Sequence, residues 1–457
     1  TWPRLMQHNQ HIAELGPLLT RCGVRHVVIC PGSRNAPLTQ LFTSGDPFYA
    51  YSIVDERSAG YVALGMSRQL GEPVGVVTTS GTAVLNLAPA VAEAYHQRIP
   101  LVVLTADRPL EEIPQFNNQW LDQEAPYYSF SKGFYQLPLE VYHTEDLERM
   151  LVHVERLISS AVTPPDGPVH LNVPLAEPLY KKLPMPTLNK GGAVNHEDPG
   201  ETDLSDPGPV PADSKILVLA GMGAHDEALQ KSLVHLTERR HTVVVAENIT
   251  NLPGEGFIAH PDLLLAGTSK QIRETLVPDL VISFGGQVVS KRLKLFLQSP
   301  GGPDHVEIAG DVVSFLDQLA GQNVAGGGFS NSYLNSWKSA EERIMALARE
   351  KLENLPFGNL SAIHMIVSRV PSGTVMHLGN SATIRYSQLT PMRKDLLYYS
   401  NRGTSGIDGC VSSAVGAALV SEKMHLLVLG DLSFVYDSNA LWNKDFPDNL
   451  KIVVMND

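Results

Sequence analysis

The sequence predicts an α/β protein made of three doubly wound, parallel-sheet domains. Three observations support this class. The chain has 457 residues, more than one hydrophobic core usually organises. Short, wholly apolar runs, typical of strands buried in parallel sheets, alternate with longer helix-forming stretches. A stretch rich in Pro, Gly, Asp and Asn at 186–213 is typical of a linker between domains.

The first predicted domain covers residues 1–185. Its apolar runs predict buried parallel strands at 26–30, 75–78 and 101–105. Between them, 59–70 and 85–96 carry helix-forming, partly amphipathic sequence. Such an alternation of strands and helices indicates a doubly wound parallel sheet.

The second and third predicted domains, 186–345 and 346–457, repeat this construction. The strands expected in the second are 216–219, 242–246 and 280–284, and a helix at 336–352 leads into the third. The third is expected to hold strands at 375–378, 396–399, 426–429 and 452–455 and an alanine-rich helix at 411–420. Ligands of open parallel sheets bind at the carboxyl ends of the strands, so the loops there are the candidate sites.

Composition and charge argue against nucleic-acid and membrane binding. The chain has 35 basic and 48 acidic residues and a net charge of −13, which disfavours general binding to nucleic acids or anionic membranes. No apolar run approaches the roughly 20 residues of a membrane span, and the first ten residues lack a signal-peptide pattern. The three cysteines show no metal-type spacing, so a cytoplasmic location is expected.

The strongest chemical signal is a pair of oxygen-bearing side chains that follow two predicted strands. Asp431, within Gly430-Asp431-Leu432-Ser433, comes after the strand at 426–429, and Asn456 ends the run at 452–455. Mg²⁺ accepts one or two such protein ligands together with phosphate oxygens. Each residue alone would be an ordinary turn residue. The pair at this spacing favours a cation that bridges phosphates.

A second signal is the acidic pair Asp55-Glu56 at the start of the helix-forming stretch 59–70. A carboxylate in this position can relay a proton to a bound cofactor. The alternative is an acid favoured only by the helix dipole. Taken alone, the pair favours the helix-dipole explanation; beside the metal motif, Glu56 becomes a candidate acid/base residue.

Three polar or small-residue loops also follow predicted strands. Arg34, in the loop 30–37, could bind a carboxylate together with backbone amides, and an ordinary turn with a surface arginine fits about as well. The loop 78–83 around Ser80 would let a cofactor ring approach closely, or would cap a helix. The amides in 117–120 could bind polar substrate groups or form a surface loop.

Basic residues recur after the predicted strands. A lone arginine there is usually solvated and contributes about 0–1 kcal/mol through a surface ion pair. Five or six such cations in one chain of negative net charge indicate substrates with several carboxylates. They include Arg108, Lys291, Arg292, Arg385 and Arg402.

Taken in order, these motifs resemble the 2-succinyl-5-enolpyruvyl-6-hydroxy-3-cyclohexene-1-carboxylate synthase family of thiamine-diphosphate enzymes. The resemblance spans the whole chain, and the Ser-Asn-Arg-Gly block and the Gly-Asp-Leu-Ser variant are its most specific parts. The matching segments are 31–35, 55–57, 79–83, 107–109, 118–119, 290–292, 400–409 and 430–433.

The resemblance implies a pyrimidine-binding domain (1–185), a central domain (186–345) and a diphosphate-binding domain (346–457) of the thiamine-diphosphate-enzyme type. It also implies a cytoplasmic homodimer or homotetramer with its active site at the subunit interface. Members of the family continue past Asp457 with residues that cover the cofactor. The implied activity is that of a carboligase in menaquinone biosynthesis, a transferase that decarboxylates 2-oxoglutarate and adds the succinyl carbanion equivalent to isochorismate.

The same resemblance implies a role for each matching residue. Glu56 would activate thiamine diphosphate, and Asp431 and Asn456 would bind Mg²⁺, with Mn²⁺ as a possible substitute. Further cofactor-binding residues would be Ser80, Ser381, Ile407, Leu432 and Ser433. The substrate-binding residues would be Ser33, Arg34, Arg108, Asn118, Gln119, Lys291, Arg292, Arg385 and Arg402.

Two alternatives stay open on the sequence alone. The first is another thiamine enzyme, such as a 2-oxo acid decarboxylase or an acetolactate-type synthase, although the set of arginines argues against an apolar pyruvate pocket. The second is a non-catalytic, ligand-binding regulator with the same fold, since fold does not dictate function. The presence of Glu56, Asp431 and Asn456 favours catalysis.

Overall fold

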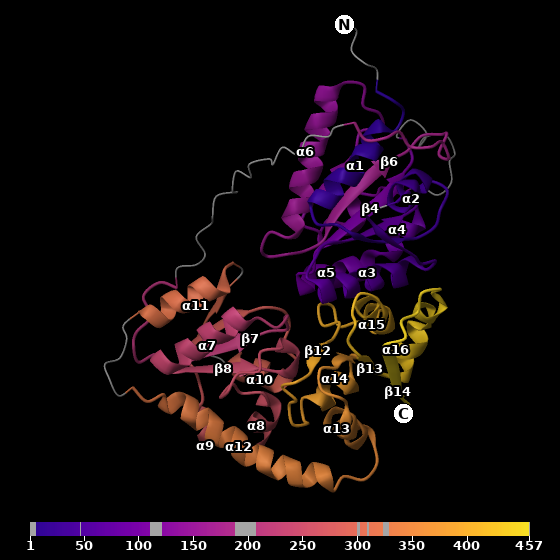
Figure 1. Cartoon of the computed structure of the whole chain (residues 1–457). Coiled ribbons are helices and arrows are strands. Elements are labelled where there is room, and N and C mark those ends of the chain that lie inside the picture. The colour runs from indigo at the N-terminus through magenta and orange to yellow at the C-terminus, as the bar shows by residue number, and fades with distance from the viewer. Residues whose placement is uncertain are drawn as a thin grey trace. The chain divides into compact units, whose positions relative to one another are not determined.

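The computed structural model describes residues 6–45, 47–109, 121–187, 207–298, 302–308, 310–322 and 329–456. They form three β-sheets with parallel strand pairs and with helices in the connections (Figure 1). The predicted fold class, an α/β protein with three parallel sheets, is therefore confirmed. No helix in these described ranges is both long and apolar enough to cross a membrane.

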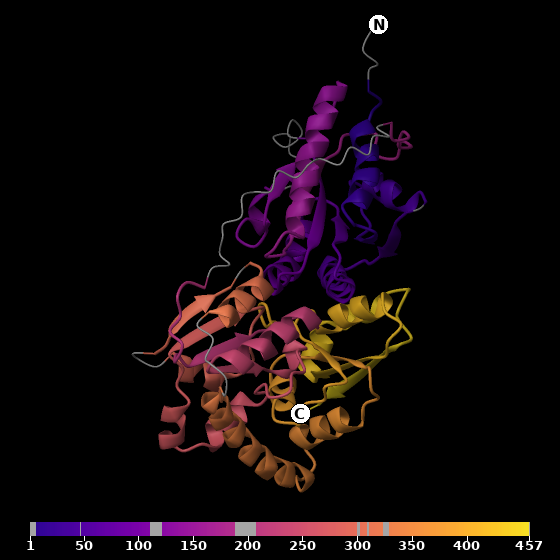
Figure 2. The ribbon, with the colours of Figure 1, turned by 60° about the vertical axis from the view of Figure 1, so that its left-hand side comes forward.

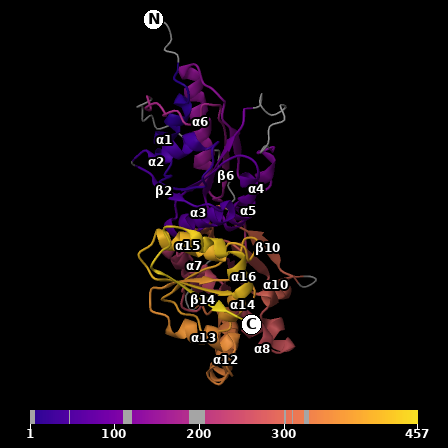
Figure 3. The same cartoon turned by 90° about the vertical axis from the view of Figure 1, so that its right-hand side faces the viewer.

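The first sheet has six strands in the order β2-β1-β3-β4-β6-β5, and Figure 3 shows β2 at its edge. Its strands are β1 (His26–Ile29), β2 (Tyr49–Ser52), β3 (Val74–Thr78), β4 (Leu101–Asp107), β5 (Phe134–Gln136) and β6 (Val169–Pro174). The helices of this region are α1 (Gln10–Arg21), α2 (Ala36–Thr43), α3 (Glu56–Leu70), α4 (Thr82–Asn86), α5 (Ala88–Gln97), η2 (Ala125–Tyr127) and α6 (Thr144–Ala161).

The second sheet has four strands in the order β10-β9-β7-β8. These are β7 (Ile216–Ala220), β8 (Thr242–Ala246), β9 (Leu280–Phe284) and β10 (Asp304–Glu307). The helices of this region are α7 (Glu227–Arg239), η3 (Asn248–Thr250), α8 (Pro261–Gly267), α9 (Lys270–Thr275), α10 (Lys291–Leu297), α11 (Val312–Gly321) and α12 (Ser332–Glu353).

The third sheet also has four strands, in the order β12-β11-β13-β14. These are β11 (Val375–Leu378), β12 (Leu397–Tyr399), β13 (His425–Gly430) and β14 (Leu450–Met455). Its connections contain α13 (Asn359–Arg369), α14 (Ala382–Ser387), α15 (Cys410–Leu419), α16 (Asp431–Tyr436) and η4 (Ser438–Trp442).

The chain divides by its packing into two compact units. Unit 1 contains Thr1–Glu197, Gly403–Glu422 and Leu432–Leu450, and unit 2 contains Asp198–Arg402, Lys423–Asp431 and Lys451–Asp457. Unit 1 thus combines the first sheet with α15 and η4, whereas unit 2 holds the second and third sheets. The predicted domain limits, at 185 and 345, remain a prediction.

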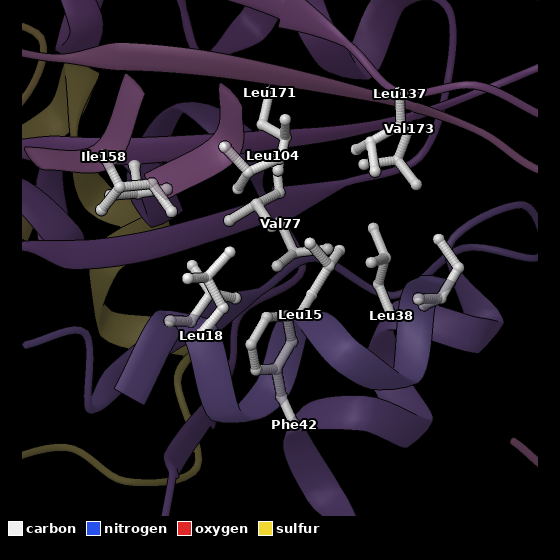
Figure 4. Close-up of a cluster of buried hydrophobic side chains, with 14 of the residues drawn as sticks. Leu15, Leu18, Leu38, Phe42, Val77, Leu104, Leu137, Ile158, Leu171 and Val173 are labelled. Carbon is white, nitrogen blue, oxygen red and sulfur yellow. The ribbon is translucent and has the colours of Figure 1, made fainter. Parts of the chain in front are cut away.

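The core of unit 1 lies between its sheet and the helices packed on it. Figure 4 shows Leu15 and Leu18 of α1 and Phe42 of α2 facing Val77 and Leu104 of the strands. All five side chains are at most 1% exposed, and burial of each stabilises the fold by about 1.5–3 kcal/mol. Helix α6 lies beside α1, as Figures 1 and 2 show, and adds Ile158 to this cluster.

Helices α3 and α15 of unit 1 pack so closely that two glycines are required. A Cβ atom on Gly65 would lie 2.0 Å from the carbonyl oxygen of Ser413, and one on Gly416 would lie 2.0 Å from that of Val62. Both distances are far inside van der Waals contact. At one point of this pair, the hydroxyl groups of Ser58 and Ser412 form a 2.9 Å hydrogen bond.

Unit 2 has apolar clusters on both faces of the second sheet and a further cluster at the third. The cluster formed with α8, α10 and α12 contains Leu264, Leu293 and Trp337, all fully buried. The cluster on the other face is formed with α7 and α11, and the one at the third sheet with α13 and α14. Helices therefore cover both faces of the second sheet, as the predicted class requires.

The predicted elements agree with the structure, and the helix-forming stretch at 85–96 is helical except at Leu87. The chain forms α4 and α5 there, with a break at Leu87. Pro89 lies in the first turn of α5, where it needs no amide hydrogen bond. Inside one continuous helix, Pro89 would have removed a hydrogen bond and clashed with the preceding turn.

Candidate active site

Glu56 is the first residue of α3, and its neighbour Asp55 caps the helix. The Asp55 carboxylate accepts hydrogen bonds from the backbone N–H groups of Arg57 (2.9 Å) and Ser58 (3.5 Å), and a third from the Asn439 side chain (2.6 Å). The alternative explanation of this acidic pair, a role at the start of the helix, therefore applies to Asp55. Glu56 is half-buried, and this burial raises its pKa.

Arg57, the next residue, is used to join two helices of unit 1. Its guanidinium donates a 2.7 Å hydrogen bond to the Tyr436 carbonyl and lies 4.7 Å from the centre of the Tyr436 ring. This contact ties the start of α3 to the end of α16. The position of Glu56 therefore depends on residues far away in the sequence.

Two small-residue loops meet after β1 and β3. A Cβ atom on Gly32 would lie 2.5 Å from Cβ of Thr79, so the loop with Ser33 and Arg34 lies against the loop with Ser80. Ser80 is 2% exposed, and the Gly81 that follows has a φ of 80°, a left-handed conformation that favours glycine. The two loops are therefore closely packed, with both Ser80 and Gly81 buried.

The loop that contains Ser80 is held by Gln123, a residue that the sequence did not single out. Its side-chain oxygen accepts from the Gly81 N–H (3.2 Å), and its amide nitrogen donates to the Ala106 carbonyl (3.3 Å) and to Asn172 Oδ1 (2.8 Å). Gln123 is 2% exposed. No local pattern marks it, because its partners lie after β3, in β4 and in β6.

The predicted substrate-binding residues of unit 1 differ in exposure. Ser33 is exposed, whereas Arg34 is only 8% exposed and donates a 2.7 Å hydrogen bond to the Leu175 carbonyl. Arg34 therefore has a structural role in addition to any ligand contact. Arg108 is half-buried and follows Asp107, whose carboxylate accepts from the Arg108 N–H (2.7 Å). Asn118 and Gln119 lie outside the described residues.

Glu93 fixes the loop that carries Ile407. Its buried carboxylate accepts hydrogen bonds from the backbone N–H groups of Gly403 (2.7 Å) and Thr404 (2.6 Å). Further along, the Ser433 hydroxyl donates to the Ile407 carbonyl at 3.0 Å. Ile407 and Leu432 remain exposed to 37% and 72%. Ser433 thus orients this loop, a contact that its motif did not predict.

In unit 2, the loops after β11 and β12 are joined by Asn380. Its side chain donates to the Asn401 carbonyl (2.7 Å) and accepts from the Arg402 guanidinium (3.1 Å). The next residue, Ser381, has a φ of 71°, which is unusual for a residue with a side chain. Backbone strain of this kind persists where the surrounding contacts enforce it, often at a ligand site.

Asp431 and Asn456 follow β13 and β14, which are neighbours in the third sheet. Asp431 is half-buried and begins α16, and Asn456 is exposed. No cluster of three or more His, Cys, Asp or Glu residues that could hold a metal occurs within the described ranges. One carboxylate and one amide oxygen fit a Mg²⁺ ion whose remaining ligands are phosphate and water oxygens.

Helix α10 has seven residues and carries basic side chains at its first, second and fourth positions. Lys291 and Arg292 are exposed, as is Arg385 at the end of α14. The same helix carries a further basic residue, Lys294, which the sequence analysis did not name. Its Nζ donates a hydrogen bond to the side-chain oxygen of Gln287 at 3.3 Å. Burial lowers the pKa of Lys294, and the nearby Arg402 lowers it further. The signal that could have identified Lys294 is its position one helical turn after Lys291.

Comparisons with known proteins show which family the chain resembles. Residues 11–126 match the family model described as the thiamine pyrophosphate enzyme, N-terminal TPP binding domain. Three relatives are each named 2-succinyl-5-enolpyruvyl-6-hydroxy-3-cyclohexene-1-carboxylate synthase. The protein of Desulfotalea psychrophila is 38% identical, over 99% of this chain and 86% of its own length. Those of Bacteroides fragilis and Cytophaga hutchinsonii are each 34% identical over 98% of this chain, and over 82% and 83% of their own lengths.

These relatives confirm the resemblance carried by the motifs from residue 31 to residue 433. Identity above 30% extends along nearly the whole chain, so the match is not restricted to one domain. The chain therefore belongs to the 2-succinyl-5-enolpyruvyl-6-hydroxy-3-cyclohexene-1-carboxylate synthase family of thiamine-diphosphate enzymes.

Proposed function

We propose that this protein is a thiamine-diphosphate-dependent transferase of menaquinone biosynthesis. It decarboxylates 2-oxoglutarate and adds the remaining succinyl unit to isochorismate, giving 2-succinyl-5-enolpyruvyl-6-hydroxy-3-cyclohexene-1-carboxylate and CO₂. Beside family membership, the observation that supports this most directly is the state of Glu56. It is half-buried at the start of α3, burial raises its pKa, and Asp55 performs the capping.

Glu56 holds and transfers the proton that activates the cofactor. Thiamine diphosphate, when bound, would accept the electron pair that stays on the substrate carbon when CO₂ leaves. The cofactor-binding residues are Glu56, Ser80, Ser381, Ile407, Leu432 and Ser433. Asp431 and Asn456 hold Mg²⁺, or Mn²⁺ in its place, as their oxygen donors and their neighbouring strands suit.

Cationic side chains orient the two acidic substrates. Both substrates carry carboxylates, and preorganised donors stabilise such charges without reorganising during the reaction. Lys294 and Arg402 are close enough for each charge to affect the other, and a bound carboxylate would relieve that repulsion. The proposed substrate-binding residues are Ser33, Arg34, Arg108, Asn118, Gln119, Lys291, Arg292, Arg385 and Arg402.

The enzyme is proposed to work in the cytoplasm as a homodimer or homotetramer with its active site at the subunit interface. The exposed side chains of Ile407 and Leu432 support this assembly, because an interface at the cofactor would cover them. The three domains are proposed to be the pyrimidine-binding (1–185), central (186–345) and diphosphate-binding (346–457) domains.

The test is loss of isochorismate absorbance in the presence of thiamine diphosphate, Mg²⁺ and 2-oxoglutarate. Glu56→Gln should slow the reaction by about 100-fold or more, the usual contribution of a positioned acid or base. Glu72→Gln, an exposed acid just beyond the end of α3, is the control and should match the wild type. Turnover of pyruvate alone, without loss of isochorismate, would instead assign the protein to another thiamine activity.

A further inference from the structure

Glu247 is a buried acid that the proposed chemistry does not use. It follows β8 and is 1% exposed. Its carboxylate accepts hydrogen bonds from two consecutive backbone N–H groups, those of Val289 (2.5 Å) and Ser290 (2.7 Å). A carboxylate that is buried in this way is fully engaged with the backbone 42 residues further along the chain. The segment that it fixes is the one immediately before α10.

A second acid completes the attachment of this segment. Ser290 is the N-cap of α10, where its hydroxyl accepts from the Leu293 N–H (3.1 Å) and donates to Asp262 Oδ1 (2.5 Å). The same Asp262 oxygen accepts from the Arg292 N–H at 3.1 Å. Glu247 and Asp262 together therefore fix the backbone from 289 to 292. These residues carry the predicted substrate-binding pair Lys291 and Arg292.

The charges around Glu247 match this role. Lys294, on α10, attracts the Glu247 carboxylate, and Asp262 repels it. Helix α10 has only seven residues, and a helix this short is not stable alone in water. The direction of its basic side chains must therefore come from external contacts, of which Glu247 supplies the most buried pair.

The structure assigns Glu247 as a positioning residue that aims Lys291 and Arg292 at the carboxylates of the substrates. This inference rests on the proposed function. Glu247 touches no substrate itself. It acts through the backbone of 289–290, and replacing it should change substrate binding more than the chemical step.

Helix α8 provides a matched control. The Glu341 carboxylate accepts from the N–H groups of Ala259 (2.8 Å) and His260 (2.7 Å), the two residues immediately before α8. The attachment is the same, and α8 also has seven residues, but it contains no basic residue. Glu341→Gln should therefore reproduce the structural cost of Glu247→Gln with a smaller effect on substrates, because α8 reaches the basic pair only through Asp262.

The experiment compares Glu247→Gln with Glu341→Gln in the full chain. We expect Glu247→Gln to raise KM for 2-oxoglutarate or isochorismate about tenfold, as loss of one charge-assisted contact would, and to change kcat little. Glu341→Gln should lower Tm about as much as Glu247→Gln does and raise KM less, because α8 reaches the basic pair only through Asp262. Hydrogen exchange should accelerate at 289–290 in the first variant and at 259–260 in the second.

A double-mutant cycle then tests whether Glu247 acts through the basic pair. In a Lys291→Ala/Arg292→Ala background, Glu247→Gln should raise KM no further, because coupled residues are not additive. An equal rise in both backgrounds, or KM values that stay at the wild-type level in Glu247→Gln, overturns the inference. A wild type inactive toward isochorismate overturns the proposed function instead.

A folding defect would not leave the question open. If Glu247→Gln yields no folded protein, Glu247→Asp keeps a carboxylate on a side chain shorter by one methylene. It goes through the same kinetics with Glu341→Asp as its control. A higher KM in Glu247→Asp alone supports the inference, and equal KM values in the two variants overturn it.

Discussion

Helices α8 and α10 are attached to unit 2 in the same way and yet differ in what they carry. Each has seven residues, and each is preceded by two backbone amides bound to a glutamate from elsewhere in the chain. Helix α8 buries Leu264 and Leu265, whereas α10 buries only Leu293 and presents basic residues. The comparison shows that the same anchoring holds two helices with different side chains, and the proposed substrate-binding pair lies on only one of them.

The largest expected effect tests whether both helices contribute equally to the core. Leu264→Ala and Leu293→Ala each empty part of the same buried cluster and should each lower the free energy of unfolding by about 2–5 kcal/mol. Chemical denaturation measures this. Leu293→Ala should also raise KM more than Leu264→Ala does, because α10 carries the proposed substrate-binding residues and α8 reaches them only through Asp262. A similar KM change in Leu264→Ala would remove the distinction between the helices.

A smaller effect tests the charges themselves. Lys291→Ala combined with Arg292→Ala should lower kcat/KM about 100-fold, which corresponds to loss of two charged hydrogen bonds of about 1.4 kcal/mol each. Steady-state kinetics with each substrate varied will show which carboxylate is bound. Arg273→Ala on the neighbouring, exposed helix α9 is the control. If Arg273→Ala has the same effect, general electrostatic attraction explains the result.

The smallest effect distinguishes the two glutamates by pH. Burial raises the pKa of Glu247 to about 7 and that of Glu341 to about 6. In both cases the folded state binds more protons than the unfolded one above pH 4.5, so the free energy of unfolding falls as pH rises to the folded pKa. At about 1.4 kcal/mol per pKa unit, the fall is about 3 kcal/mol for Glu247 and 2 kcal/mol for Glu341.

Urea denaturation between pH 4.5 and 8 measures this difference. In Glu247→Gln, the free energy of unfolding should no longer show the decrease that Glu247 causes up to about pH 7. In Glu341→Gln, it should no longer show the decrease that Glu341 causes up to about pH 6. The two variants should therefore diverge by about 1 kcal/mol between pH 6 and 7. Identical pH profiles of the two variants would contradict the assignment.

The sequence predicted the fold well because buried parallel strands are marked by local apolar runs. The runs at 242–246, 280–284 and 375–378 coincide with β8, β9 and β11. The helix-forming stretch at 85–96 is also helical, but its pattern did not reveal the break at Leu87 that precedes Pro89. Strands and helices are predicted from the pattern of neighbouring residues, so a boundary that a single residue sets is easily missed.

The motifs of the candidate site could be predicted from the sequence, but the residues that hold its loops in place could not. Glu56, Asp431 and Asn456 stand at strand or helix ends, where the sequence placed them. Glu93, Gln123 and Glu247 could not be predicted, because each binds backbone amides of a distant loop. The burial of Arg34 against the Leu175 carbonyl was missed for the same reason.

The close packing of α3 on α15, at Gly65 and Gly416, has a consequence for synthesis of the chain. Helix α3 can be covered by α15 only after residue 419 has left the ribosome, when the first sheet and the whole central region are already made. Until then, the nascent chain exposes a helix face suited to close packing. Exposed apolar surface of this kind is a binding site for chaperones and a starting point for aggregation during translation.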